Sequence, residues 1–289
     1  MDGSFNLGDL ADKTVYSYDA AGRMKMLNGD SPGNDSTVWR PDNRPQQITA
    51  FSQNANFYVV NNHYYLYDAN GDQVRDINYS YWKSISTGTL SQVVQDTTYS
   101  VYDANHVKVA SYLMQTPLTG TTDRMLPSER YIYGSDRLAT IQRWNQVGTN
   151  VVYGIFSVPW VWGPSSYKDY EMKDHLGNIR ATILGTTQPI GGGAVMVPAS
   201  AFNYYTYGQL ENYYSPGSNE YSFSFNGQQR NDDVAGLGNH NTALYWEYGT
   251  REGRRWNRDL QKNPWESDYA VFGDNPITTL FQNNVLWQF

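Results

Sequence analysis

The sequence predicts an all-β protein of antiparallel hairpins that curl into a shell or barrel-like sheet, followed by a small mixed C-terminal plug-like segment. Two repeated features predict this fold. Asp-x-x-Gly or a near copy occurs four times, each time after a short strand-like run, and aromatic residues recur two positions apart. Residues i and i+2 of a strand point to the same face, so each pair lays two rings side by side. A repeat of this kind decides the fold class before any domain is assigned.

The acidic motif predicts a tight turn. Asp suits the first position of a type I turn and Gly the fourth, so each unit is expected to be a strand, a turn and a returning strand. His106 replaces the glycine of the third copy, where a left-handed backbone would cost roughly 1–2 kcal/mol, so a looser turn is expected there. The turn residues are Asp19 and Gly22, Asp68 and Gly71, Asp103 with His106, Asp174 and Gly177, and the related Asn226 and Gly227.

The aromatic pairs predict a ladder of rings on the sheet. Tyr is far more frequent than Phe (25 against 10), and aromatic residues pack well on sheet faces. Regular spacing by two residues favours rings that form the core of the sheet over rings that bind a ligand. The ladder residues are Tyr16, Tyr18, Tyr65, Tyr67, Tyr131, Tyr133, Tyr205, Tyr207, Phe223 and Phe225.

Four segments are expected along the chain. Residues 1–12 form an N-terminal segment and residues 13–185 the hairpin array. Residues 186–199 form a Gly-rich linker, because no Lys-Ser/Thr follows the glycine triplet that a phosphate-binding loop would need. Residues 200–289 form the C-terminal segment, with a short helix near residues 242–252.

Composition excludes several classes of protein. A net charge of −7 disfavours nucleic-acid binding, which needs a basic face. Cysteine is absent, so there are no disulfides. No run of 18 apolar residues predicts a membrane span, and no signal peptide is visible. None of the four histidines falls in a metal-ligand spacing, so no metal or cofactor is expected.

Ordered sequence blocks carry a resemblance to a known family. The run Tyr18-Asp19-Ala20-Ala21-Gly22-Arg23 resembles the YD repeat of bacterial Rhs proteins. Residues 170–182, which contain Asp174-His175-Leu176-Gly177-Asn178, are similar to the stretch that marks the RHS-repeat-associated core. Residues 225–234 resemble the Phe-Asn-Gly-Lys-Glu-x-Asp-Asp/Glu-Val block of the Bacteroidetes branch. Arg251–Arg254, Asp259, Pro264-Trp265 and Asp274–Ile277 follow in the family's order, so the resemblance runs from about residue 13 to 277.

The resemblance implies a curled β-shell that encloses a variable C-terminal toxin or forms a cell-surface scaffold. Many members end this core at Asp-Pro-x-Gly, where they cleave themselves with the help of aspartates. The corresponding positions here, Leu280-Phe281-Gln282-Asn283-Asn284, hold no Asp, Pro or Gly. The resemblance therefore does not predict an enzyme. Asp232, Asp233 and Asp259 are the candidate catalytic residues if self-cleavage remains.

The expected function is a non-enzymatic β-shell module of a secreted or injected bacterial protein, located outside the cell or on its surface. Its partner would be another polypeptide: an enclosed effector, a longer repeat-bearing chain or secretion machinery. One alternative is a cell-surface adhesive protein that binds glycans, with Trp160 and Trp162 as stacking platforms. The other is a self-cleaving core with a degenerate cleavage motif.

Overall fold

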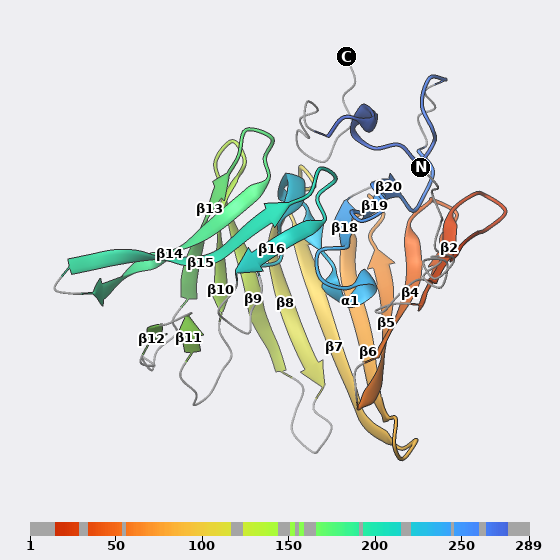
Figure 1. The fold of residues 1–289 in the computed structure, drawn as a ribbon, viewed down its shortest axis with the longest axis horizontal. Helices are drawn as coiled ribbons and strands as arrows, with labels where there is room; N and C mark the ends of the chain where they lie inside the picture. The colour runs from red at the N-terminus through yellow and green to blue at the C-terminus, as the bar shows by residue number, and fades with distance from the viewer. Residues whose placement is uncertain are drawn as a thin grey trace, which may run out of the picture.

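The computed structural model describes residues 15–28, 34–53, 56–116, 124–143, 151–153, 156–158, 166–190, 193–214, 221–243, 246–259 and 264–276. Most of them belong to one large sheet (Figure 1). Its strands are β1 (Val15–Tyr18), β2 (Met24–Asn28), β3 (Asn34–Trp39), β4 (Pro45–Gln53), β5 (Phe57–Tyr67), β6 (Gln73–Ser84), β7 (Leu90–Tyr102), β8 (Lys108–Thr116), β9 (Arg124–Tyr133), β10 (Arg137–Arg143), β13 (Ser166–Lys173), β14 (Ile179–Ile190), β15 (Gly193–Tyr204) and β16 (Leu210–Tyr214).

The remaining elements are short. A separate two-stranded hairpin lies between β10 and β13 in the sequence, and a four-stranded sheet lies near the C-terminus. They are β11 (Val151–Tyr153), β12 (Phe156–Val158), the 3-10 helix η2 (Phe225–Gly227), β17 (Gln229–Arg230), α1 (Asp232–Ala235), β18 (His240–Ala243), β19 (Trp246–Gly249), β20 (Arg254–Arg255) and the 3-10 helix η3 (Phe272–Asp274). None of the helices in these ranges has the length and apolar composition needed to cross a bilayer.

The large sheet has fourteen strands, and each pairs antiparallel with the next strand of the sheet. The prediction of an all-β antiparallel fold is therefore confirmed. The sheet curls, and α1 and β18 lie over one of its faces, here called the inner face (Figure 1). Its described strands run from β1 at one end to β16 at the other, so closure into a shell or barrel remains a prediction.

The expected linker lies mostly inside the sheet. Residues 186–190 end β14, residues 193–199 begin β15, and Ile190 pairs with Gly193 at the closed end of the hairpin. A glycine run suits a close reversal of the chain as well as it suits a linker, because glycine tolerates unusual backbone angles. The division of the chain into four segments otherwise stays a prediction.

The helix expected near residues 242–252 is wrong. The chain forms β18 and β19 there, and the two strands pair antiparallel. Trp246 and Tyr248 are both buried, and both rings contact Phe272. Two rings two residues apart reach the same neighbour from one face of a strand, so packing favours an extended chain over a helix.

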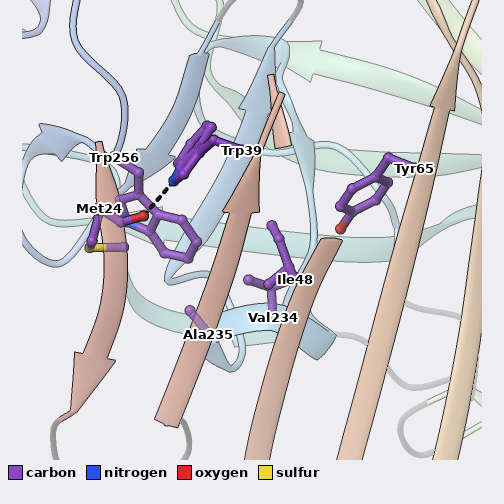
Figure 2. Packing of buried hydrophobic residues seen from close by; sticks show 7 residues of the cluster. All are labelled: Met24, Trp39, Ile48, Tyr65, Val234, Ala235 and Trp256. Carbon is purple, nitrogen blue, oxygen red and sulfur yellow. Dashed lines mark hydrogen bonds between the residues drawn. The ribbon is translucent and has the colours of Figure 1, made fainter. Parts of the chain in front are cut away.

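The described residues between 221 and 276 are here called the covering segment, and the part around α1 and Trp256 packs on the inner face. Figure 2 shows Val234, Ala235 and Trp256 of this segment against Ile48 and other residues of β2–β5. Ile48 is fully buried, and Val234 is 1% exposed. Burying side chains of this size stabilises a fold by roughly 1.5–3 kcal/mol each, so this cluster is a main attachment between the two parts.

Candidate functional site

The four acidic turns share one hydrogen-bond pattern. In each turn, Oδ1 of the aspartate accepts bonds from the backbone N–H groups two and four residues later, over 2.8–3.0 Å. The fourth residue has a positive φ of 64–92°. The side chain therefore fixes the turn from inside, which is the role that Asp plays in Asx turns. The four aspartates are Asp19, Asp68, Asp103 and Asp174.

The third turn closes like the others, so the looser turn expected at His106 is wrong. The His106 N–H donates to Asp103 O over 3.2 Å, and the Gly71 N–H makes the same bond at the same length. The His106 ring also lies 2.7 Å from a carboxylate oxygen of Asp72, which is 2% exposed. This hydrogen bond offsets the cost of the left-handed backbone. It also raises the pKa of His106.

A second set of bonds joins successive hairpins at the edge where the acidic turns lie. The side chain that ends one strand donates to the carbonyl of the residue that begins the adjacent strand of the preceding hairpin. We call these bonds turn-edge rungs. The six are Trp39 Nε1 to Met24 O (2.6 Å), Tyr67 OH to Pro45 O (2.9 Å), Tyr102 OH to Gln73 O (3.2 Å), Tyr133 OH to Lys108 O (2.7 Å), Lys173 Nζ to Arg137 O (2.8 Å) and Tyr204 OH to Ile179 O (2.7 Å).

The rungs give a physical reason for Tyr directly before the turn. At this edge the strands of each rung are not joined by a turn, so a side-chain bond holds them together. Burial raises the pKa of Tyr102 to about 12, so its hydroxyl keeps the proton that it donates. Tyr18 occupies the same position in the first hairpin, is 51% exposed and packs its ring near Tyr269.

Not every predicted ladder residue lies in a strand. Tyr205 and Tyr207 lie in a turn that closes with the Gly208 N–H on Tyr205 O, and Phe225 begins η2. The positive φ of Gly208 and of Gly227 interrupts the extended chain at both places. Tyr16, Tyr65 and Tyr131 lie in strands, and Phe223 forms an isolated bridge with Gln229.

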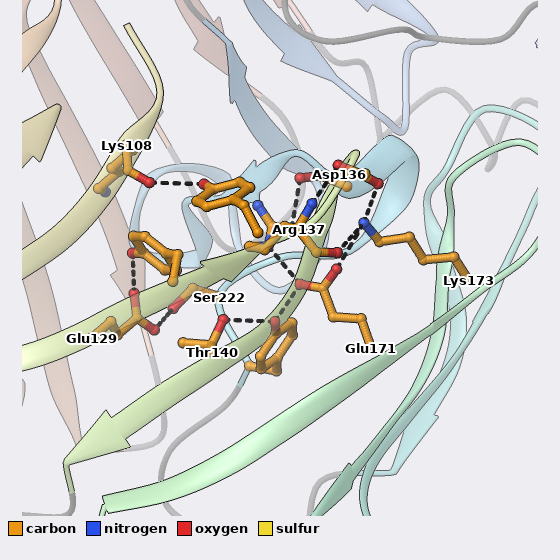
Figure 3. Close-up of polar contacts among 12 residues, drawn as sticks. Lys108, Glu129, Asp136, Arg137, Thr140, Glu171, Lys173 and Ser222 are labelled. Carbon is orange, nitrogen blue, oxygen red and sulfur yellow. Dashed lines mark hydrogen bonds and ion pairs between the residues drawn. The ribbon is translucent and has the colours of Figure 1, made fainter. Parts of the chain in front are cut away.

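A polar network holds the start of the covering segment on β9, β10 and β13 (Figure 3). The buried Glu171 accepts from Arg137 Nε over 2.5 Å and lies 2.9 Å from Lys173 Nζ. It also accepts from the Tyr221 hydroxyl, and Arg137 donates to Gly227 O over 3.0 Å. Charge-assisted bonds of this kind are stronger than neutral ones, so they fix where the segment docks.

A second contact of the same network uses Glu129 on β9. One of its carboxylate oxygens accepts from Ser222 of the covering segment over 2.8 Å, and the other accepts from Tyr131 over 2.6 Å. Asp169 lies on the same face, is 5% exposed, and has one oxygen without a hydrogen-bond partner in the described residues. Burial, and then the charge of Glu129, raise the pKa of Asp169 to about 7.

The inner face and the covering segment line a cavity of about 1280 Å³ whose wall has both polar and apolar parts. The sheet contributes His63, Asp76, Asn78 and Asp96 to its wall, and α1 contributes Asp233. His63 on β5, Asn78 on β6 and Asp96 on β7 are direct cross-strand neighbours. The topology therefore brings together residues that are distant in the sequence.

Two carboxylates of the cavity, Asp96 and Asp233, are poorly stabilised as charges. Burial raises the pKa of Asp96, and the nearby charge of Asp233 raises it further. Asp233 faces the cavity, but surrounding protein limits its hydration and raises its pKa. Burial alone would lower the pKa of His63, yet the hydrogen bond between its Nδ1 and Asp76 (3.1 Å), together with the charges of Asp76 and Asp233, outweighs burial and raises that pKa.

The three candidate catalytic aspartates have different surroundings. Asp232 binds Arg230 (3.0 Å), Asp259 binds Arg255 (2.8 Å), and Asp233 lines the cavity. Asp232 also accepts from the Gly238 N–H over 2.8 Å. The arginine pairs hold Asp232 and Asp259 as structural ions, whereas Asp233 is accessible to a ligand. Trp160, Trp162 and residues 280–284 lie outside the described residues. In the part that is described, no group of His, Cys, Asp or Glu is placed to hold a metal ion.

Sequence reasoning missed the cavity and the rung bonds; of the six donors, only Tyr67 and Tyr102 stand in a Tyr-Asp motif. Trp39, Tyr133, Lys173 and Tyr204 carry rungs without standing in a Tyr-Asp motif, and the cavity row comes from three strands. The rungs could have been predicted from one recurring feature. The last residue of every second strand of the large sheet is a long side chain that ends in a hydrogen-bond donor.

The comparisons with known proteins give a distant likeness. No protein-family model and no curated protein matches the chain. The crystal structure of TcdB2-TccC3-TEV is similar, with a TM-score of 0.47, 12% identity and coverage of 94% of this chain and 10% of that chain. The crystal structure of TcdB2-TccC3 gives a TM-score of 0.39 and 13% identity, with coverage of 95% of this chain and 17% of that chain.

This chain therefore spans only a small part of the length of those two chains. At such low identities and TM-scores, neither likeness decides the family, the activity or the partners of this protein. The family suggested by the sequence blocks stays a prediction.

Proposed function

We propose that this chain is a non-enzymatic structural module, a section of β-wall that encloses or displays another polypeptide in a secreted or injected bacterial protein. The six turn-edge rungs carry this proposal. They repeat one bond from hairpin to hairpin along the turn edge of the sheet, which stiffens a curved surface and does not assemble a reaction centre. The ordered sequence blocks that resemble Rhs proteins support the same function.

The inner face is the side that would meet the enclosed polypeptide. The covering segment already packs on part of this face. Trp82 near the far end of β6 lies on the same face as Asp76 and Asn78, and it is 41% exposed. Tyr81, its neighbour, points to the other face because side chains alternate along a strand. The two positions therefore report on opposite faces of one strand.

Photo-crosslinking from these positions tests the proposal. The chain is produced in its native host with p-benzoylphenylalanine at position 82 or, as a matched control, at position 81. Enclosure predicts a cross-linked polypeptide from position 82 and none from position 81. Cross-links from position 81 alone would indicate a partner displayed on the outer face. Absence of a cross-linked polypeptide at both positions would contradict the proposal.

A separate measurement tests self-cleavage. The expected product of expression is one species with the full-length mass, since the family's cleavage motif is missing at residues 280–284. The arginine partners of Asp232 and Asp259 agree with structural roles for these two residues. Two fragments that divide the chain near residue 280 would instead support the self-cleaving alternative.

A further inference from the structure

We propose that the cavity under the covering segment is a binding site for a neutral, hydroxyl-rich ligand, a saccharide in chemical class. Its walls would be the row His63, Asn78 and Asp96 on the sheet, with Asp233 and Gln228 from the covering segment. The argument for this site does not use Trp160 or Trp162, and it does not depend on the wall function proposed above.

The row on the sheet offers three polar atoms that have no hydrogen-bond partner among the described residues. They are His63 Nε2, Asn78 Oδ1 and Asp96 Oδ1. Direct cross-strand neighbours have Cβ atoms roughly 5 Å apart, so the row spans about 10 Å. Asp76 holds the His63 ring through Nδ1, and Nε2 is left buried without a partner in the described residues. The three groups are therefore held by rigid strands and aligned for one ligand.

The opposite wall contains a buried amide with the same property. Gln228 is only 5% exposed, and neither its Oε1 nor its Nε2 has a hydrogen-bond partner in the described part of the chain. A buried polar group that lacks a partner costs roughly 1–3 kcal/mol. A side chain on the cavity wall in this state indicates that the cavity contents complete its bonds.

The mixture of donors and acceptors selects the class of ligand. The acceptors include carboxylate and amide oxygens, whereas Gln228 Nε2 is a donor. Each hydroxyl both donates and accepts, so a saccharide can satisfy all of these atoms. A cation only donates and would leave Nε2 without a bond. An anion at this row would face Asp76, Asp96 and Asp233, whereas the arginines of the cavity lining are paired with carboxylates of their own: Arg44 with Asp42, Arg137 with Glu171 and Arg230 with Asp232. The cavity volume of about 1280 Å³ leaves room for more than one sugar ring.

Titration calorimetry on the full chain tests the proposal. The probes are glucose, mannose, galactose, N-acetylglucosamine, maltose and cellobiose, with spermidine and sulfate as charged alternatives. At least one of the saccharides is expected to bind with a stoichiometry of one. Gln228→Ala and Asn78→Ala should each weaken that binding at least tenfold, because each removes a wall group that bonds the ligand.

Two further variants keep the result interpretable. Gln95→Ala is the matched control for Gln228→Ala, since Gln95 adjoins Asp96 on β7 but points to the opposite face, and its binding should stay within twofold. Asp96→Asn keeps the shape of the side chain and should weaken binding without loss of fold. The proposal is overturned if none of the saccharides binds, which would mean a cavity filled by water alone, or if only spermidine or sulfate binds. Binding that is unchanged in Gln228→Ala and Asn78→Ala would overturn it as well.

Discussion

At the scale of single residues, the repeat works through two bonds with different ranges. The aspartate bonds its own turn, within four residues of itself. The residue before it bonds the preceding hairpin, across 22 residues for Tyr67 and 29 for Tyr102. The first bond fixes the conformation of the turn, and the second fixes the position of that hairpin against the preceding one. A Tyr-Asp pair therefore encodes both the turn and its attachment to the neighbouring hairpin.

Removing one hydroxyl measures how much a rung bond contributes to the free energy of unfolding. Tyr204→Phe deletes the donor of the 2.7 Å bond to Ile179, a residue that is fully buried. The free energy of unfolding should fall by about 1–2 kcal/mol, because a buried carbonyl loses its partner. Urea unfolding measures the change as a lower midpoint with an unchanged slope.

Tyr18→Phe is the control for this rung. Tyr18 has the same position in its hairpin, but it is half exposed and its hydroxyl makes no hydrogen bond within the described ranges. Its loss should change the unfolding free energy by less than about 0.5 kcal/mol. Equal effects of the two substitutions would mean that the rung bond does not stabilise the sheet.

At the scale of elements, local features were predictable from the sequence and long-range ones were not. The turns at Asp19, Asp68 and Asp174 depend on bonds within four residues, so the motif contains them. The pairing of β14 with β15 joins residues of two strands and leaves no motif in the sequence. The glycines near the closed end of this hairpin were therefore interpreted as a linker. The cavity row joins His63 to Asp96 through a strand between them, a relation that no motif records.

Strand β13 contains a carboxyl group that should make stability depend on pH. The pKa of Asp169 is about 7 in the folded chain, against an ordinary value near 3.9 in the unfolded chain. Between these values the folded state binds more protons than the unfolded state, so stability falls as pH rises from about 4 to 7. Above that range the charged Asp169 carboxylate destabilises the fold by about 4 kcal/mol, since each pKa unit corresponds to roughly 1.4 kcal/mol.

Asp169→Asn should remove this dependence. The variant is expected to be more stable than the parent at pH 8, and the difference should shrink toward pH 5, where Asp169 is already largely protonated in the folded chain. Urea unfolding at several pH values measures both. A parent chain that gains stability from pH 5 to pH 8 relative to the variant would show that the Asp169 carboxyl is stabilised as a charge.

At the scale of the whole molecule, the sheet and the covering segment hold each other through two kinds of contact. The cluster around Ile48, Val234 and Trp256 supplies apolar burial at one end of the sheet. The network around Arg137 and Glu171 supplies charged bonds toward the other end. The cavity lies between the sheet and this segment, so its shape depends on both attachments.

Glu171→Gln tests how far the segment depends on the charged attachment. The substitution removes the charge that neutralises Arg137, which is 8% exposed, and Lys173. An unpaired buried charge typically costs 3–5 kcal/mol. The variant should therefore unfold at lower urea, and amide hydrogen exchange should speed up first in residues 221–227. Glu211→Gln is the matched control, since Glu211 is exposed on the edge strand β16, and it should leave both measurements unchanged. Faster exchange throughout the strands of the large sheet, with none specific to residues 221–227, would mean that Glu171 supports the wall itself and does not hold the covering segment.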